Sequence, residues 1–335
     1  MTEPRALVDR FGREVTDLRV SVTDRCNFRC RYCMPSEGMQ WLARDDILSF
    51  EEITRVVRAL ATHYGLASVR LTGGEPTVRA QLPRLVAQLA AVRRPDGSAL
   101  ELSMTTNGAT LALLADDLAH AGLQRINISL DTLRPDRFLA ITRRPHLARV
   151  LEGIDAALAA GLRPVKINTV VMRGFNDDEL VDLVAFGVER GVEVRFIEFM
   201  PLDGEGSWSP GDVVSEQEIL ATLAQAFRFR PLPRSHAPAT TYELVDGQGR
   251  FGVIPTVTKP FCDTCDRIRL SAEGTLRTCL FALEEHDLRP LLRGDASDEE
   301  LAARVAAIVQ TKWQGHQIGT VNFRRPAKSM SQIGG

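Results

Sequence analysis

The chain has 335 residues, of which 41 are basic and 43 are acidic, so its formal net charge is −2. Charged residues make up 25% of the sequence and hydrophobic residues 44%, a balance typical of globular proteins that excludes a disordered or collagen-like chain. No apolar run approaches the ~18 residues of a membrane span, and the first residues lack a signal-peptide core, so we expect a cytoplasmic protein. The near-zero charge argues against general nucleic-acid binding but allows a locally basic pocket.

Over the first two thirds of the chain, short β-branched segments alternate with amphipathic helical patterns. The expected strands are Leu18–Val22, Ser68–Thr72, Leu100–Thr105, Arg125–Leu130, Pro164–Val170 and Glu193–Phe199. Consecutive strand–helix units predict a parallel sheet covered by helices. Because there are six units rather than eight, we expect an α/β fold with an incomplete (βα)6 barrel similar to a TIM barrel, with a doubly wound sheet as the alternative.

This pattern ends near Met200, where turn-rich and proline-rich stretches begin. Shorter strand patterns follow at Thr241–Leu244, Phe251–Val257, Arg267–Leu270 and Thr275–Leu280, and a last helix is expected over Asp298–Lys312. We therefore divide the chain into a barrel core over residues 1–235 and a C-terminal extension over residues 236–335. We expect this extension to be antiparallel and helical and to cover the barrel mouth.

Within the expected strands, apolar and polar side chains alternate. Leu18 and Val20 share one face of the first strand, whereas Arg19 lies on the other. Because helices cover the outside of a barrel, the apolar faces should point outward and the polar faces should line the lumen. A lumen that carries Arg19, Arg70 and Lys166 is energetically costly unless it binds a ligand. The alternative is a sheet solvated on one face, as antiparallel sheets are.

Three cysteines, Cys26, Cys30 and Cys33, follow the first expected strand with the spacing C-x3-C-x2-C. Three thiolates in one short loop suit an iron–sulfur cluster. Structural zinc needs a fourth ligand, and no histidine lies within twenty residues of this loop. A 4Fe–4S cluster held by three cysteines leaves one iron open for another ligand, whereas a zinc or adventitious site is the alternative.

The same loop, with the aromatic Tyr32 before its last cysteine, resembles the signature of the radical SAM superfamily. In that superfamily the open iron chelates S-adenosylmethionine (SAM), and one electron from the cluster cleaves SAM to methionine and a 5′-deoxyadenosyl radical. The segment Leu71–Pro76 contains Gly-Gly-Glu-Pro and looks like the superfamily motif that contacts SAM. The resemblance implies that Cys26, Cys30 and Cys33 hold the cluster, and that SAM is bound by Tyr32, Gly74, Ser129 and Met200.

A second group of cysteines, Cys262, Cys265 and Cys279, has the spacing C-x2-C-x13-C. It again lacks a fourth cysteine, which favours another 4Fe–4S cluster with an open iron. His286 is the nearest spare ligand in the sequence and keeps a zinc site as the alternative.

Two arginines, Arg267 and Arg269, share one face of the strand that follows the Cys262–Cys265 pair. Guanidinium groups beside a cluster suit the recognition of a phosphate or a purine edge. In isolation, an exposed edge strand would explain the two arginines better.

Together these features resemble the GTP 3′,8-cyclase (molybdenum cofactor biosynthesis protein A) family, and the resemblance runs from Leu18 to the final glycines. It rests on the segments LRVSVTDRCNFRC, RLTGGEP, TTNG, NIS, KIN, FCDTCDRIRL and LRTCL. It implies a lyase with two 4Fe–4S clusters that uses SAM to convert GTP into (8S)-3′,8-cyclo-7,8-dihydroguanosine 5′-triphosphate. It also implies that GTP is bound by Arg19, Arg70, Thr105, Lys166, Arg267, Ile268 and Arg269.

The resemblance further implies a homodimer, an unidentified one-electron donor and a downstream enzyme, cyclic pyranopterin monophosphate synthase, with no nucleic-acid or membrane partner. The C-terminal pair Gly334–Gly335 corresponds to a tail that reaches into the active site in this family, but a frayed chain end explains it equally well. Two other functions stay open: another radical SAM enzyme with an auxiliary cluster, such as a peptide maturase, and a non-enzymatic iron–sulfur or zinc protein.

Overall fold

The computed structural model of the chain describes residues 5–35, 37–202, 206, 208–233 and 237–334, so the expected boundary at residue 235 and Gly335 lie outside the described residues. The expected parallel barrel core is confirmed, because six strands lie side by side in chain order and each neighbouring pair is parallel. These strands are β1 (Asp17–Ser21), β2 (Ser68–Thr72), β3 (Glu101–Thr106), β4 (Arg125–Ser129), β5 (Val165–Val171) and β6 (Glu193–Glu198).

Strands from the C-terminal region extend this sheet at both edges. β10 (Arg267–Leu270) pairs in parallel with β1, and β9 (Arg250–Ile254) pairs in parallel with β6. Antiparallel strands lie beyond them: β8 (Thr240–Leu244) and β11 (Thr275–Arg277), which the sequence predicts, and β7 (Phe229–Pro231) and β12 (His286–Asp287), which it does not. The extension is therefore antiparallel only in its outer part, and its two inner strands lengthen the parallel barrel wall.

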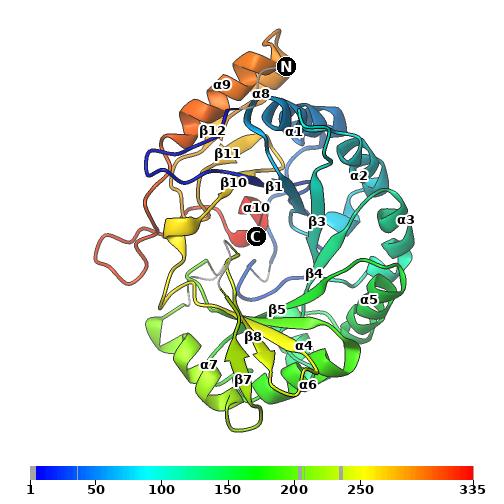
Figure 1. Ribbon diagram of the computed structural model, residues 1–335, viewed down its shortest axis with the longest axis vertical. Helices are drawn as coiled ribbons and strands as arrows, with labels where there is room; N and C mark the ends of the chain where they lie inside the picture. The colour runs from blue at the N-terminus through cyan, green and yellow to red at the C-terminus, as the bar shows by residue number, and fades with distance from the viewer. Residues whose placement is uncertain (1–4, 36, 203–205, 207, 234–236, 335) are drawn as a thin grey trace.

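Helices cover the outer face of the ring of strands (Figure 1). They are α1 (Phe50–Tyr64), α2 (Leu82–Ala90), α3 (Ala115–His120), α5 (Leu147–Ala159) and α6 (Leu180–Arg190). α4 (Pro135–Thr142) contacts the cysteine loop, since the backbone N–H of Arg29 donates to the carbonyl oxygen of Thr142 at 3.0 Å. Ser49 begins α1 with a capping box, because its hydroxyl and the Glu52 carboxylate each accept the other residue's backbone N–H. Gly65 ends α1 in the left-handed region, with φ 64°. Both boundaries are set by residues within a few positions of one another in the sequence.

The remaining helices belong to the C-terminal half. They are α7 (Glu216–Leu223), α8 (Arg289–Arg293), α9 (Asp298–Val309) and α10 (Met330–Ile333), with short 3₁₀ helices η1 (Arg44–Asp46), η2 (Pro76–Val78), η3 (Leu111–Leu113), η4 (Pro210–Asp212) and η5 (Cys262–Thr264). An ion pair of 2.8 Å between Arg55 and Asp298 joins α1 to α9. α10 lies in the centre of the ring (Figure 1). Among the helices of the described residues, none combines the length and apolar character that a bilayer crossing requires.

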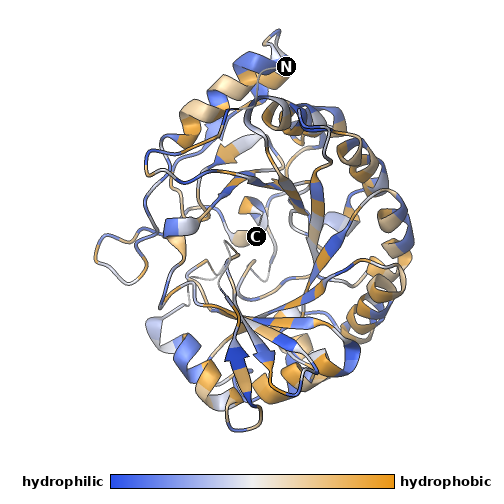
Figure 2. Ribbon diagram, in the orientation of Figure 1, coloured by the Kyte–Doolittle hydropathy of each residue, from blue (hydrophilic) through white to orange (hydrophobic). Residues whose placement is uncertain are grey.

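The hydrophobic core lies between the outer helices and the sheet. Hydrophobic and hydrophilic residues alternate along the strands (Figure 2). Leu18 and Val20 of β1 are fully buried in this core, whereas Arg19, Arg70 and Lys166 line a cavity on the inner face. The polar lumen predicted from strand alternation is therefore confirmed.

Candidate active site

A cavity of about 140 Å³ lies where the carboxyl ends of β1–β4 meet. This is the end of a parallel barrel at which loops carry functional groups. Cys26, Cys30 and Cys33 line the cavity together with Gly74 and Ser129, so the structure brings these predicted site residues together. All three cysteines are free thiols and half-buried, and they could ligate a cluster from a single loop.

The glycine turn after β2 packs directly against the cysteine loop. A Cβ atom added to Gly74 would lie 2.4 Å from the carbonyl oxygens of Asp24 and Arg25, a distance that real Cβ atoms essentially never show. The backbone N–H of Gly74 donates to the carbonyl oxygen of Thr23 at 2.8 Å. Glycine at this position therefore allows a close approach that holds the cysteine loop against β2.

Glu75 of the same turn is a buried anchor. Its carboxylate accepts hydrogen bonds from the backbone N–H groups of Thr77 (3.0 Å) and Asn107 (2.6 Å) and from the hydroxyl of Thr106 (2.6 Å). Burial raises the pKa of Glu75, and these hydrogen bonds oppose that shift. The Asn107 side chain donates to that of Asn27 at 2.7 Å, so Glu75 and Asn107 connect the ends of β2 and β3 to the cysteine loop.

Tyr32 is oriented by a residue that follows β4. Its hydroxyl donates to one carboxylate oxygen of Asp131 at 2.8 Å, and the backbone N–H of Val170 donates to the other at 2.8 Å. Asp131 is buried, and burial raises its pKa to about 6. The Tyr32 ring is thereby held where the first cavity meets the centre of the barrel.

A second cavity, of about 200 Å³, lies in the centre of the barrel and shares Tyr32, Thr105 and Ser129 with the first. The residues predicted to bind SAM or GTP that line this central cavity are Arg19, Tyr32, Arg70, Thr105, Ser129, Met200, Arg267 and Arg269. Ile268 does not join them, because strand alternation places its side chain on the opposite face, where it is fully buried in the core.

A third cavity, of about 220 Å³, lies toward the amino ends of the strands and is lined by basic residues. They are Arg19, Arg70, Arg125, Lys166, Arg195 and Arg267. Arg125 and Arg195 belong to none of the motifs that point to the site in the sequence. Strand alternation is the signal that could have found them, since Arg125 shares the face of Asn127 and Ser129 in β4, and Arg195 occupies an inward position of β6.

These cations are crowded and only partly neutralised. The Glu193 carboxylate lies 3.6 Å from the Lys166 ammonium and 2.6 Å from the Arg195 guanidinium. Burial, followed by repulsion from Arg195, lowers the pKa of Lys166 to about 8. Burial also lowers the pKa of both Arg70 and Arg269 to about 10. A lumen of this kind favours a polyanionic ligand.

Several hydrogen-bond donors in the lumen are unsatisfied. The buried Nε atoms of Arg19, Arg70 and Arg267, and the Nη2 atom of Arg267, have no hydrogen-bond partner in the part of the chain that the structure describes. A buried donor without a partner costs about 1–3 kcal/mol. A ligand with several acceptor oxygens would satisfy these groups.

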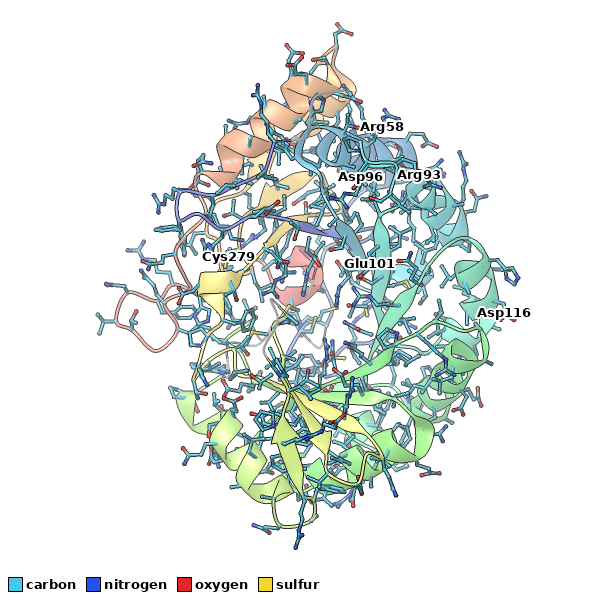
Figure 3. The ribbon with its side chains drawn as sticks, viewed as in Figure 1. Arg58, Arg93, Asp96, Glu101, Asp116 and Cys279 are labelled. Carbon is cyan, nitrogen blue, oxygen red and sulfur yellow. The ribbon has the colours of Figure 1, made fainter. Side chains whose placement is uncertain are left out.

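The second cysteine triad lies at the opposite end of the barrel from the first. Cys265 precedes β10, which is parallel to β1, and Cys279 follows the antiparallel β11, so both lie near the amino end of β1. Figure 3 shows Cys279 on the side of the ring formed by β10 and β11. Phe261 and Leu280, which are direct neighbours of cysteines in the chain, line the central cavity. The central cavity therefore adjoins the cavity of the first triad and is lined by chain neighbours of the second triad.

The two triads have different electrostatic surroundings. Burial raises the pKa of Cys26 to about 12 and that of Cys33 to about 11. Burial also acts on Cys265, but the nearby cations Arg267 and Lys312 outweigh it and lower the pKa of this thiol to about 7. The thiolate, which is the metal-binding form of cysteine, is therefore favoured at Cys265.

His286, the other ligand considered for the second triad, lies in β12, where it pairs with Leu276 of β11. Within the described ranges, no three Cys, His, Asp or Glu side chains are grouped like the ligands of a single metal ion. Cys262, Cys265 and Cys279 are free, half-buried thiols, and cations lie beside Cys265. Thiolates of this kind suit zinc or an iron–sulfur cluster.

The C-terminal tail enters the site. Met330 and Ser331 of α10 line the cavity of the first triad. The carbonyl oxygen of Gly334 accepts a hydrogen bond from Arg269, and a Cβ atom added to Gly334 would lie 2.9 Å from the Thr72 hydroxyl. Of the two interpretations of the final glycines, the structure favours insertion into the site as far as Gly334.

Both halves of the chain match known protein families. Residues 20–187 match the radical SAM superfamily, and residues 192–318 match the family Molybdenum Cofactor Synthesis C. The chain is 46% identical over 338 residues to the GTP 3′,8-cyclase of Corynebacterium glutamicum, covering 99% of this chain and 90% of that protein. It is 49% identical over 333 residues to the GTP 3′,8-cyclase of Streptomyces coelicolor, covering 98% of this chain and 96% of that protein.

The fold has counterparts among solved structures. Streptococcus suis SuiB bound to S-adenosylmethionine has a TM-score of 0.61 to this chain at 14% sequence identity, over 89% of this chain and 68% of SuiB. This likeness shows a shared fold.

Proposed function

The chain belongs to the GTP 3′,8-cyclase family of radical SAM enzymes, and from this premise we propose how its site carries out the reaction. The protein is a lyase that uses SAM to convert GTP into (8S)-3′,8-cyclo-7,8-dihydroguanosine 5′-triphosphate, the first step of molybdenum cofactor biosynthesis. The observation that carries the proposal is the central cavity, which adjoins the cavity of the first cysteine triad and is lined by arginines with unsatisfied donors.

The first triad suits the 4Fe–4S cluster that defines radical SAM enzymes. Three free thiols of one loop line one cavity, and a cluster with three cysteine ligands has an open iron for SAM. When bound, the reduced cluster supplies the electron that cleaves SAM to methionine and a 5′-deoxyadenosyl radical, the species that removes hydrogen from GTP. The residues we propose to bind SAM line this cavity or the adjoining one: Tyr32, Gly74, Ser129 and Met200.

The basic lumen suits the triphosphate of GTP. We assign this role to Arg19, Arg70, Lys166, Arg267 and Arg269, with Thr105, and extend it to Arg125 and Arg195. Guanidinium groups bind phosphate oxygens in pairs, which would satisfy the free Nε and Nη2 atoms of Arg267. Each contact near 4 Å could contribute up to ~4 kcal/mol at an effective dielectric constant near 20.

The second triad would hold a second 4Fe–4S cluster on Cys262, Cys265 and Cys279. Three thiols are again the donors, and the cations near Cys265 favour its thiolate. A cluster held by these thiols would supply an open iron as a ligand site for the guanine, and the lumen arginines would bind the triphosphate of the same GTP. Zinc is the competing metal, and the iron, sulfide and zinc contents of the purified protein distinguish the two.

The contribution of the chain to the reaction is positioning and the exclusion of water. The loss of hydrogen from the ribose C3′ leaves a carbon radical, which must attack C8 of the guanine before another hydrogen donor quenches it. Anchoring the triphosphate and the guanine separately holds the ribose in one orientation toward SAM. The inserted α10 tail closes the cavity of the first triad on one side.

The proposal extends to the surroundings of the enzyme. We assign residues 1–235 to the barrel core and residues 236–335 to the extension that supplies the second triad. By family membership we propose a cytoplasmic homodimer, a one-electron donor, and a downstream cyclic pyranopterin monophosphate synthase that consumes the product.

The test is a labelling experiment. The protein is reconstituted anaerobically, reduced, and incubated with SAM and GTP deuterated at the ribose 3′ position, and deuterium in 5′-deoxyadenosine is measured by mass spectrometry. We expect transfer of the label. SAM cleavage without transfer would reject GTP or the C3′ position, and absence of SAM cleavage in protein loaded with iron and sulfide would reject the enzymatic function.

A further inference from the structure

Lys312, just beyond the end of α9, is buried beside the second cysteine triad. The chain has four lysines, and Lys312 alone among them is fully buried, with 2% of its surface exposed. A buried ammonium is costly unless hydrogen bonds and a negative charge compensate it. The question is therefore which groups hold this charge inside the protein.

The Lys312 ammonium joins the two segments that carry the second triad. It donates to the carbonyl oxygens of Arg267 and Thr278 (the latter at 3.0 Å) and lies 3.6 Å from the sulfur of Cys265. Arg267 lies two residues after Cys265, and Thr278 directly precedes Cys279. One side chain thus connects the start of β10 to the segment after β11, and the sulfur that it faces is that of Cys265.

A second buried cation at this site shows a different arrangement. Arg13 donates to the carbonyl oxygens of Cys262 (2.7 Å) and Gln314 (2.7 Å), and its Nε pairs with the Asp9 carboxylate at 2.6 Å. The charge of Arg13 is therefore paired with that of Asp9, and its hydrogen bonds connect the N-terminal segment to the Cys262 loop. The hydrogen-bond partners of Lys312 are two carbonyl oxygens and a sulfur, so its charge is directed at the cysteine site.

We infer that Lys312 is a positioning residue of the second cluster: it fixes Cys265 and Cys279 relative to each other, and its buried charge raises the reduction potential of the cluster. This inference rests on the proposed second 4Fe–4S cluster. One-electron reduction adds negative charge to the cluster, and a fixed cation beside a sulfur ligand stabilises the reduced form more than the oxidised form. Hydrogen bonds and charges around the sulfur ligands are known determinants of cluster potentials.

The test uses a chain in which the second cluster is observed alone. Cys26, Cys30 and Cys33 are replaced by serine together, so that iron and spectroscopic signals report on the second triad. Into this background we introduce Lys312→Met, which removes charge and donors, and Lys312→Gln, which keeps a donor without the charge. Lys259→Met is the matched control, because Lys259 lies three residues before Cys262 with its side chain 68% exposed.

Two quantities are measured after anaerobic reconstitution: iron and sulfide per chain, and the midpoint potential of the cluster from an electron paramagnetic resonance titration. We expect Lys312→Met to retain less iron and to shift the potential to a more negative value. Lys312→Gln should keep more iron than Lys312→Met but show a similar negative shift. Lys259→Met should leave both quantities unchanged.

The outcomes separate failure of this inference from failure of the second cluster. If the triple-serine background with Lys312 intact binds zinc or less than one four-iron cluster, the proposed second cluster is wrong. If it binds the cluster and both Lys312 variants keep its potential and iron content, the inference about Lys312 is wrong. If Lys312→Met holds no cluster, the midpoint potential of the cluster in Lys312→Gln is decisive. A negative shift supports the role of the Lys312 charge, and an unchanged potential rejects it.

Discussion

Arg269 of β10 donates a hydrogen bond to the carbonyl oxygen of Gly334, the residue after α10. Arg269 is 6% exposed and lines the central cavity next to Arg267 and Arg19. A residue that we propose to bind GTP is therefore also hydrogen-bonded to the C-terminal tail.

The first prediction concerns this contact. Arg269→Ala should release the tail, because it removes the donor to Gly334, and it should uncouple SAM cleavage from product formation. Hydrogen exchange over residues 329–334 should become faster. Arg289→Ala, which breaks a surface ion pair with Asp287 (3.1 Å), should leave the tail unchanged. Equal exchange in Arg269→Ala and the unmodified chain would show that the contact does not order the tail.

The glycine turn after β2 can be tested by adding one methyl group. Gly74→Ala should displace the cysteine loop, since the new Cβ would lie 2.4 Å from the carbonyl oxygens of Asp24 and Arg25. We expect a loss of about 1–3 kcal/mol in the free energy of unfolding and loss of iron from the first triad. Gly211→Ala is the control, because the nearest atom to its Cβ is 3.5 Å away. Normal iron content in Gly74→Ala would contradict the proposed packing role.

Arg195 tests the assignment of the basic lumen. Arg195→Gln should raise KM for GTP about tenfold, equivalent to ~1.4 kcal/mol, because one charged phosphate contact is lost, whereas KM for SAM should stay unchanged. The control is Arg93→Gln, since Arg93 is exposed and lies at the outer edge of the ring (Figure 3). If KM for GTP does not respond to Arg195→Gln, the role of Arg195 is limited to its ion pair with Glu193 (2.6 Å).

Lys166 predicts a pH dependence of GTP binding. Burial, then repulsion from Arg195, lowers the pKa of Lys166 from 10.5 to about 8. Between pH 8 and pH 10.5, Lys166 binds a proton more often in the unfolded chain than in the folded one. The free energy of unfolding therefore increases as pH rises through this range. Bound triphosphate favours the charged ammonium, so GTP affinity should fall as pH rises above about 8.

Calorimetry tests this prediction directly. Titrations with GTP near pH 8, in buffers of different ionisation enthalpy, should show proton uptake on binding. Lys166→Met should bind more weakly and abolish the part of the uptake that Lys166 contributes. Uptake that persists undiminished in Lys166→Met would assign the proton to another group.

The crowded lumen also predicts strong stabilisation by ligand. At a GTP concentration of about 100 Kd, the free energy of unfolding should increase by about 2.7 kcal/mol. Guanosine at the same concentration should stabilise much less, because it cannot satisfy the donors of Arg19, Arg70 and Arg267 that lack partners among the described residues. Equal thermal shifts with GTP and guanosine would show that the triphosphate, and therefore the basic lumen, does not contribute to binding.

Local signals in the sequence predicted the barrel core and much of the site. The capping box at Ser49 and the left-handed Gly65 depend on residues a few positions apart, so α1 could be bounded without tertiary information. The alternation of side chains along a strand likewise has a fixed period of two, which is why Arg19 and Lys166 could be placed in the lumen.

These local signals could not predict which strands far apart in the chain pair with each other. Whether β9 and β10 run parallel or antiparallel to their neighbours depends on contacts with β6 and β1, which are far away in the chain. Alternation in β6 would also have given Arg195, but its contact with Glu193 and the lumen became evident only in the folded barrel.

The sequence by itself determined the two cysteine triads, the strand–helix units and the inward face of each barrel strand, because spacing and alternation are local properties. Only the tertiary structure placed the triads at opposite ends of one lumen and brought Gly334 onto Arg269. It also buried Lys312, which at the end of an amphipathic helix would be expected to face solvent. These relationships depend on which distant segments pack together, and a local pattern carries no information about that packing.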